Sequence, residues 1–352
     1  MARPTPSAPL HATQQRPILL LGAGELGLAL LHHLTTHPSF SPTLHPVTLA
    51  LRPSTFTDPN RAADLASYRA IHPAVSFLGL DIADAATTVE VLAAKFGEGG
   101  YGTIIHANGM TLPPGSQRKL TEAVLLYAAA EEGDSGKKRG VRYLPWQFGV
   151  DYDILGPRNA GDGLFSEAYG VRELLRSPQN QGTVEWLVVS CGIFTSFLFE
   201  EIWGVVTTTP EKQIRVRALG SWEDGITATT AGDIARVTAE LVLEPHGYVK
   251  EWRENKVYIA GETLTYAQLV DTVQRVTARE VLRDQVWDRA TTAREVQNAS
   301  ADQKKIWQYR AVFGGGEGVS WPVEETWNQK RGWVMEGIEG WLTKNLGKFS
   351  MK

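Results

Sequence analysis

The feature that most constrains the fold is the stretch of residues 17–27, PILLLGAGELG. Its apolar part, Ile18–Leu21, indicates a buried parallel strand, because it is hydrophobic at every position rather than at alternate ones. A G-x-G-x-x-G turn follows directly, and residues 28–34 then have the composition of a helix that ends near Pro38. Strand, glycine turn and helix in immediate succession form the fingerprint of a dinucleotide-binding unit.

The three glycines of this turn have separate roles in that fingerprint. Gly22 permits the tight turn, Gly24 lets the backbone approach a pyrophosphate, and Gly27 lets the helix pack closely on the strand. The N-terminus of the helix faces the anion. We therefore expect a dinucleotide to be bound by these residues of the turn: Gly22, Gly24, Glu25, Leu26 and Gly27.

The second apolar run, Val47–Leu51, ends at Arg52, where a strand of this kind meets the ribose of the cofactor. Enzymes that use NAD place an Asp or Glu here, and that carboxylate would repel a 2′-phosphate. Residues 28–57 contain no acidic residue, and Arg52 offers a planar fork for a phosphate, with Ser54 and Thr55 as further donors. The alternative is a solvated arginine at a strand end. The pattern favours NADP(H) over NAD(H).

Two later strand ends complete the predicted cofactor site. Asp81 follows a strand over residues 75–80, and its carboxylate is expected either to accept from the adenine amine or to cap a helix. Thr103–His106 is a further strand, and His106 at its end is expected to be hydrogen-bonded, with a catalytic acid as the alternative. The small-residue loop that passes the nicotinamide ribose in such folds consists of Ala107, Asn108 and Gly109.

Strands alternate with helices through the first half of the chain, which predicts right-handed crossovers and a doubly wound parallel sheet, the Rossmann fold of the α/β class. Further strands are expected at residues 141–144 and 184–190, and helices at residues 60–71, 86–96, 118–131 and 165–176.

After Ser190 the pattern loosens, and this change suggests a boundary. We expect residues 16–190 to form an NADP-binding domain and residues 191–352 a smaller, partly interwoven substrate domain, with a strand near residues 256–260 that returns to the sheet. Helices are expected in this second part at residues 230–243, 265–277 and 299–309, and a strand at residues 214–219.

Composition excludes several classes of protein. The chain has 352 residues, 43% of them hydrophobic and 21% charged, and a net charge of −4 that gives no basic footprint for nucleic acid or an anionic membrane. No apolar window is long enough to predict a transmembrane helix. Residues 1–15, rich in Pro, Ser and Thr, are expected to be a disordered tail. The single cysteine, Cys191, excludes an internal disulfide, is expected to be buried, and suits a reducing, cytoplasmic setting.

Together these motifs resemble the NmrA-like branch of atypical short-chain dehydrogenases, which includes the isoflavone reductase-like enzymes. The resemblance covers roughly residues 18–261 and rests on the glycine turn, on Leu-Arg-Pro-Ser-Thr at residues 51–55, and on Leu-Pro-x-x-Phe-Gly-x-Asp at residues 144–151. It implies NADPH, a smaller C-terminal substrate domain, and reduction of secondary metabolites; some members only sense the cofactor as regulators. It also implies that Trp146 and Phe148 approach the nicotinamide ring, with Phe194 and Phe197 as the opposite wall of the pocket.

The sequence departs from the family at the catalytic lysine, whose position is occupied by Ala168. No Tyr-x-x-x-Lys pair replaces it. Tyr169, Tyr152 and Asp153 are the candidate substitute donors, although the structural alternative is favoured for each. A ketone reductase needs a proton donor near the developing alkoxide, whereas an iminium or a conjugated C=N or C=C bond polarised by its own nitrogen needs less help.

The leading hypothesis is therefore an NADPH-dependent reductase of an aromatic, apolar secondary metabolite, with an iminium or conjugated C=N or C=C bond of an alkaloid as the acceptor. The family resemblance also implies that such a reductase can direct a following cyclisation or cycloaddition. The competing hypothesis is a non-catalytic NADP(H)-sensing regulator.

Overall fold

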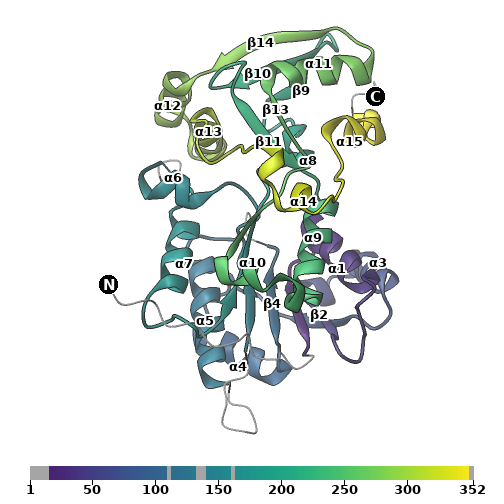
Figure 1. Ribbon diagram of the computed structural model, residues 1–352, viewed down its shortest axis with the longest axis vertical. Coiled ribbons are helices and arrows are strands. Elements are labelled where there is room, and N and C mark those ends of the chain that lie inside the picture. The colour runs from purple at the N-terminus through teal and green to yellow at the C-terminus, as the bar shows by residue number, and fades with distance from the viewer. Residues whose placement is uncertain (1–15, 109–111, 132–139, 160–162, 349–352) are drawn as a thin grey trace. The chain divides into compact units, whose positions relative to one another are not determined.

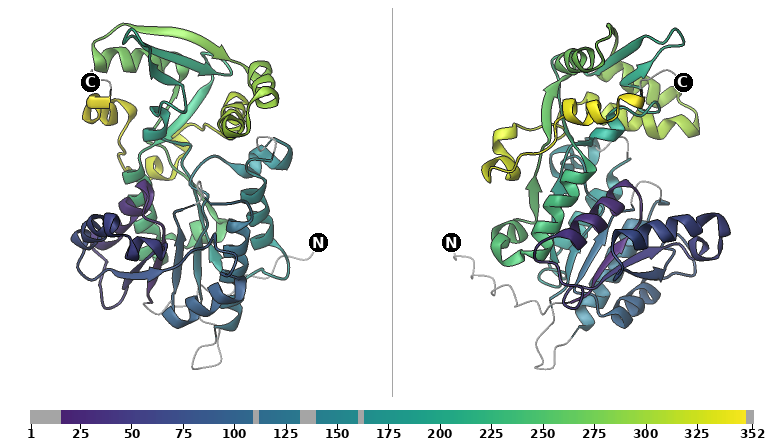
Figure 2. Two further views of the ribbon diagram at one scale, coloured as in Figure 1. Left: turned by 180° about the vertical axis from the view of Figure 1, so that it is seen from behind. Right: turned by 90° about the vertical axis from the view of Figure 1, so that its right-hand side faces the viewer.

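The computed structural model describes residues 16–108, 112–131, 140–159 and 163–348 (Figures 1 and 2). The predicted tail of residues 1–15 and the predicted cofactor residue Gly109 lie outside these ranges. The chain forms two compact units, each built from three segments. The first unit consists of residues 1–146, 171–188 and 238–256, and the second of residues 147–170, 189–237 and 257–352.

The first unit contains a six-stranded parallel sheet in the order β3-β2-β1-β4-β5-β6, which confirms the predicted doubly wound fold. The strands are β1 (Ile18–Leu21), β2 (Val47–Leu51), β3 (Ser76–Gly79), β4 (Thr103–His106), β5 (Arg142–Leu144) and β6 (Glu185–Trp186). All four residues of β1 are buried, as expected for a central strand covered on both faces.

Helices cover both faces of this sheet (Figure 2). One face packs against α4 (Val89–Gly99), α5 (Ser116–Ala130) and the end of α7 (Ser166–Arg176), which contribute Leu92, Phe96, Leu120, Val124 and Leu175 to its apolar core. The remaining helical segments of the first half are α1 (Glu25–Thr36), α2 (Ser54–Thr57), η1 (Pro59–Arg61) and α3 (Ala62–Ile71).

The predicted sixth strand over residues 184–190 is two strands, because the segment changes partner at Leu187. Its first part, β6, pairs with β5, and Leu187 N still donates to Tyr143 O. Its second part, β7 (Val188–Ser190), pairs with β12 (Lys256–Tyr258) in a separate two-stranded sheet. The strand expected near residues 256–260 therefore exists, but its partner is β7.

The second unit contains two three-stranded sheets. One has the order β14-β10-β9 and the other β13-β11-β8 (Figure 1). The strands are β8 (Ile193–Phe194), β9 (Val206–Thr208), β10 (Ile214–Leu219), β11 (Gly225–Thr229), β13 (Glu262–Thr265) and β14 (Val281–Trp287). Both α11 (Tyr266–Thr277) and α13 (Ala301–Gly314) pack against β10, and this accounts for the almost complete burial of that strand.

Several helices of the second half begin or end away from the predicted positions. The helix expected at residues 299–309 is α13 (Ala301–Gly314), and the helix before it, α12 (Arg289–Asn298), was not expected. The others are α6 (Tyr152–Asn159), α8 (Thr195–Leu198), α9 (Ala231–Leu243), η2 (Pro245–Tyr248), α10 (Val249–Glu254), α11 (Tyr266–Thr277), η3 (Val323–Glu325), α14 (Trp327–Lys330), α15 (Ile338–Lys344) and η4 (Leu346–Lys348).

The two units are interleaved along the chain. The expectation from sequence was a boundary after residue 190 with a partly interwoven second domain. Residues 147–170 belong to the second unit and residues 238–256 to the first. Cys191 is fully buried, as predicted, and burial raises the pKa of its thiol. No helix among the described residues is long and apolar enough to cross a bilayer.

Candidate functional site

The glycine turn has the geometry that the fingerprint requires. Gly22 has φ +107°, a conformation that side chains disfavour, and a Cβ there would lie 2.6 Å from Asn108 Cβ. A Cβ on Gly27 would lie 2.1 Å from the carbonyl oxygen of Gly22. Gly27 is therefore needed because the first turn of α1 folds directly back on the glycine turn.

Gly24 occupies a different environment from the other two glycines. It is the N-cap of α1, it is exposed together with Glu25, and a Cβ added to it would meet nothing within 4 Å. Gly24, as the N-cap residue, provides no side-chain hydrogen bond to the first turn of α1. The first N–H groups of a helix have no partner inside it, so this end of α1 can receive an anionic group. Leu26, the remaining predicted residue of the turn, is buried beneath it.

The end of β4 lies beside the glycine turn. Ala107 N donates to Leu21 O at 2.9 Å. Asn108 lies next to Gly22, since its Cβ would be 2.6 Å from a Cβ added to that glycine. The structure thus brings together the turn and two of the three residues predicted to pass the nicotinamide ribose.

Arg52 lies immediately after β2 with an exposed side chain. Within the described part of the chain, its guanidinium makes no hydrogen bond or ion pair, so its donors are available to a phosphate. Ser54 and Thr55 form the start of α2, where Ser54 is exposed and Thr55 is buried.

Asp81 does not cap the helix that follows it. Its carboxylate accepts from Ala83 N at 2.9 Å, which closes a local turn, while α4 begins eight residues later with Thr88 as its N-cap. The sequence offered the cap as one of two roles for Asp81, and that alternative is wrong.

His106 is fully buried at the end of β4, and the expectation that it would be hydrogen-bonded is wrong. Neither ring nitrogen has a hydrogen-bond partner among the described residues. Burial lowers the pKa of His106 to about 3, because a charged imidazolium would lose its hydration there. The ring is therefore neutral at physiological pH and cannot serve as an acid.

The position of the family lysine is part of an apolar cluster in the second unit. Ala168 is 4% exposed and belongs to the same cluster as Val150, Leu155 and Phe165. Its carbonyl oxygen accepts from Gln147 Nε2 at 2.8 Å. The small apolar side chain of Ala168 therefore fits this packing.

The three candidate donors differ in exposure. Tyr152 is buried and packs against Phe165 with ring centroids 5.0 Å apart, whereas Asp153 and Tyr169 are partly exposed. Asp153 N donates to Asp151, whose other carboxylate oxygen accepts from the hydroxyl of Tyr258.

Three of the four predicted pocket residues belong to the second unit. Phe148 is buried, Phe194 is the N-cap of α8, and Phe197 lies on α8 with its ring centroid 5.3 Å from that of Trp203 and 6.5 Å from that of Tyr309. The fourth, Trp146, is the last residue of the first segment of the first unit. Tyr309 was not predicted beside Phe197, because the segment around it is polar and amphipathic.

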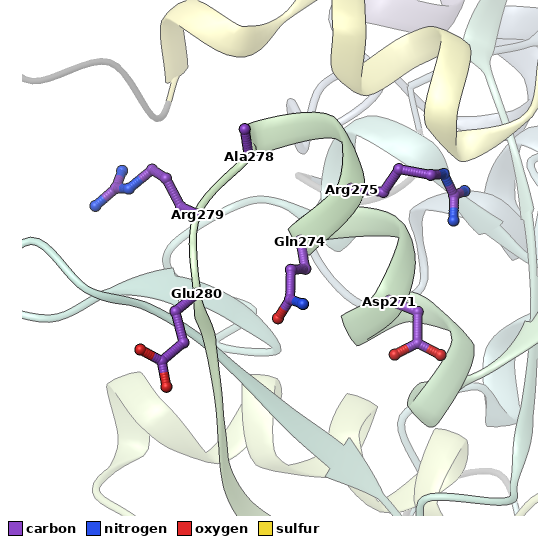
Figure 3. A pocket seen from close by; sticks show the side chains of 6 residues that line it. All are labelled: Asp271, Gln274, Arg275, Ala278, Arg279 and Glu280. Atoms are coloured by element: carbon purple, nitrogen blue, oxygen red, sulfur yellow. The ribbon is translucent and has the colours of Figure 1, made fainter.

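A cavity of about 540 Å³ lies at the end of α11, away from these residues in the sequence (Figure 3). All of its lining residues except Ala278 are polar or charged: Asp271, Gln274, Arg275, Ala278, Arg279 and Glu280. None of the predicted site residues contributes to it. The described residues also contain no cluster of three or more His, Cys, Asp or Glu side chains able to hold a metal ion.

Comparison with known proteins places this geometry in a family. An NmrA-like family domain-containing oxidoreductase of Gibberella moniliformis is 37% identical over 331 residues, which cover 92% of this chain and 96% of that protein. The chain belongs to the NmrA-like family. The resemblance inferred from its motifs is thereby confirmed, although no family model matches the chain.

Solved structures show that this NmrA-like protein shares its fold with NADPH-dependent reductases. A structure from work on pinoresinol-lariciresinol and phenylcoumaran benzylic ether reductases matches with a TM-score of 0.66 at 16% identity, covering 94% of this chain and 98% of that one. The leucoanthocyanidin reductase–NADPH complex from Vitis vinifera has a TM-score of 0.64 at 15% identity, covering 94% and 99%. The NADPH complex of the Escherichia coli quinone oxidoreductase QOR2 has a TM-score of 0.62 at 14% identity, again covering 94% and 99%.

Proposed function

We propose that this NmrA-like protein is an NADPH-dependent reductase. The observation that carries the proposal is the pairing of an open, uncapped helix start at Gly24 with an exposed arginine at the end of β2. The first turn of α1 would hold the pyrophosphate, Arg52 the 2′-phosphate, and the Ala107–Asn108 backbone the nicotinamide ribose. When bound, NADPH supplies a hydride. Its presence in structural neighbours supports this assignment.

We infer that the acceptor is a nitrogen-containing aromatic secondary metabolite, with an iminium or a conjugated C=N or C=C bond. The family lysine is absent, and its place is filled by a buried alanine. An acceptor that carries its own positive charge takes up a hydride without a strong acid beside it. The ring closure that the family resemblance implies remains a prediction. A cytoplasmic location also remains a prediction.

Turnover with simple iminium salts tests whether the protein is a reductase. Purified protein is mixed with NADPH and a series of aromatic iminium salts, and the loss of NADPH absorbance is followed. NADPH binding is measured on the same sample by calorimetry. Oxidation of NADPH that depends on the protein supports the proposal. Tight NADPH binding with no oxidation by any iminium contradicts it and favours the NADP(H)-sensing regulator.

A further inference from the structure

An exposed aromatic ring lies at the same edge of the first unit's sheet as Arg52. Phe56 belongs to α2, the short helix that follows Arg52, and is 40% exposed. Arg52 comes directly after Leu51, whose register partner in β3 is Gly79. A Cβ added to Gly79 would lie 3.7 Å from Phe56 Cε2. The arginine and the ring are therefore both placed at the carboxyl ends of β2 and β3.

The contacts of Phe56 leave much of its ring uncovered. The two ring atoms closest to the position of Gly79, Cδ2 and Cε2, belong to one edge of the ring. Phe77, on the same face of β3, has its ring centroid 6.4 Å away, with the two planes 70° apart. Among the described residues Phe56 makes no other ring contact. A flat apolar ligand that covered the exposed part of this ring would gain free energy by burying it.

The covalent structure of NADPH brings its base to this region if Arg52 holds the 2′-phosphate. The phosphate and the adenine are attached to neighbouring carbons of one ribose, so the base cannot lie far from the end of β3. Asp81 lies there as well, two residues after Gly79. Its Oδ1 accepts from Ala83 N at 2.9 Å, and within the described residues its Oδ2 accepts no hydrogen bond.

We propose that the ring of Phe56 is the surface on which the adenine of NADPH stacks, and that it makes the site selective for nucleotides over compounds without a base. The inference rests on the NADPH binding proposed above and extends it to the base. Stacking on an aromatic side chain uses the π face that every base has, so it does not distinguish one base from another. Recognition of the adenine amine is left to Asp81.

Two probes that differ only in the base test this role. Adenosine 2′,5′-bisphosphate has the base, the ribose and both phosphates, whereas methyl riboside 2,5-bisphosphate has a methoxy group in place of the base. Phe56→Leu keeps an apolar side chain on Gly79 but removes the ring. By calorimetry it should weaken binding of the adenosine probe by about tenfold and leave the methyl riboside within about twofold of wild type. Equal losses for both probes, or no loss for either, would overturn the proposal.

Phe40→Leu is the matched control. Phe40 is also partly exposed and also has an edge-to-face ring contact, with His72 at 5.4 Å. It precedes β2, however, and so lies towards the opposite, amino end of the strands. This variant should bind both probes as the wild type does, and Phe56→Tyr, which keeps the ring, should bind within about twofold of wild type. A tenfold loss in Phe40→Leu would mean a general loss of packing, and the proposal would fail.

Inosine 2′,5′-bisphosphate separates stacking from recognition of the amine. Hypoxanthine stacks as adenine does but carries an oxygen where adenine has its amine. Phe56→Leu should therefore weaken the adenosine and inosine probes by the same factor. A loss confined to the adenosine probe would show that Phe56 acts on the amine contact and would contradict stacking.

None of these probes carries a nicotinamide, so the result does not depend on turnover. The expected pattern in a protein that oxidises no NADPH would reject the reductase and retain the Phe56 site. Turnover of an iminium with unchanged affinity of Phe56→Leu for the adenosine probe would reject the site and retain the reductase. A wild-type protein that does not bind the adenosine probe would also overturn the Phe56 site.

Discussion

At the scale of single residues, Gly24 and Gly27 lie three positions apart and constrain the molecule differently. We expect Gly27→Ala to lower the free energy of unfolding by about 1–3 kcal/mol, because its Cβ would lie 2.1 Å from a backbone oxygen. A Cβ on Gly24 would have no atom within 4 Å, so the free energy of unfolding of Gly24→Ala should stay within about 1 kcal/mol of wild type, the range of an N-cap change. Its NADPH affinity should nevertheless fall by at least about tenfold. Denaturant unfolding and calorimetry measure the two quantities, and a stable Gly27→Ala protein would contradict the packing argument.

Arg52 is predicted to select the phosphorylated cofactor. Arg52→Glu should weaken NADPH binding by at least about tenfold, since it removes a charge-assisted contact of about 1.5–3 kcal/mol and adds repulsion. NADH binding should change much less. Arg253→Glu makes the same charge change at another exposed arginine of the first unit and is the control. Calorimetry that gives the same NADPH affinity for Arg52→Glu and wild type would show that Arg52 does not contact the phosphate.

His106 is predicted to make the protein less stable in acid. Its pKa in the folded state is about 3, below its usual 6.5, so below pH 6.5 the unfolded chain binds a proton that the folded protein excludes. The free energy of unfolding should therefore fall as the pH drops from 6.5 towards 3, by at most about 1.4 kcal/mol per pH unit. His106→Gln should reduce this slope between pH 7 and 5, whereas His246→Gln, at an exposed histidine, should keep it. Equal slopes in all three proteins would exclude His106 as the cause.

At the scale of elements, β14 is held to β10 by a charge pair as well as by its parallel register. Asp284 accepts from Arg217 Nε at 2.8 Å, and Arg215 Nη1 lies 3.7 Å from the same oxygen. Burial, followed by the charge of Arg215, lowers the pKa of Arg217, which shows that Arg217 has lost hydration. The carboxylate of Asp284 offsets that loss.

Asp284→Asn is therefore expected to lower the free energy of unfolding by about 1–3 kcal/mol, since two arginines would remain without their counter-charge. Asp271→Asn is the matched control on α11. Its side chain is 69% exposed and its Oδ1 lies 3.9 Å from Arg283 Nη2, so the loss should stay below about 1 kcal/mol. Chemical unfolding compares the two variants, and similar losses would mean that burial does not set the strength of these pairs.

The elements that sequence could predict are those with a strong local pattern. The uninterrupted apolar run of β1 and the glycines after it place the turn and α1 without tertiary information. The break between β6 and β7 was not predictable, because residues 184–190 are one apolar run and only the change of partner at Leu187 divides it. The helix cap, one of the two roles expected for Asp81, is wrong because capping depends on where α4 begins, and α4 begins after Thr88.

At the scale of the whole molecule, the glycine turn of the first unit could be predicted from sequence, whereas the aromatic cluster of the second unit required the fold. The glycine turn and its partners Ala107 and Asn108 are close because parallel strands end at one edge of a sheet. Tyr309 lies 157 positions after Tyr152, and no local pattern relates them. Only packing through Phe165 brings their rings into one cluster.

The interleaving of the two units predicts how fragments behave. A fragment of residues 16–190 lacks residues 238–256, in which Leu241 and Trp252 are buried and the Trp252 ring lies 5.3 Å from the guanidinium carbon of Arg142. It should show no cooperative thermal transition by circular dichroism. A fragment of residues 16–256 contains every described segment of the first unit and should unfold more cooperatively. Cooperative unfolding of the shorter fragment would mean that residues 238–256 are dispensable.

This segment order also has a consequence during synthesis on the ribosome. All six strands of the parallel sheet are present once residue 186 has emerged, yet the first unit is incomplete until residue 256. Between Trp146 and that point the nascent chain gains 110 residues, which takes about 5–20 s at about 5–20 residues per second. For that time the surface later covered by Trp252 is open to water. The newly made protein therefore passes through a period in which chaperones, rather than its own last segments, must protect its cofactor-binding half.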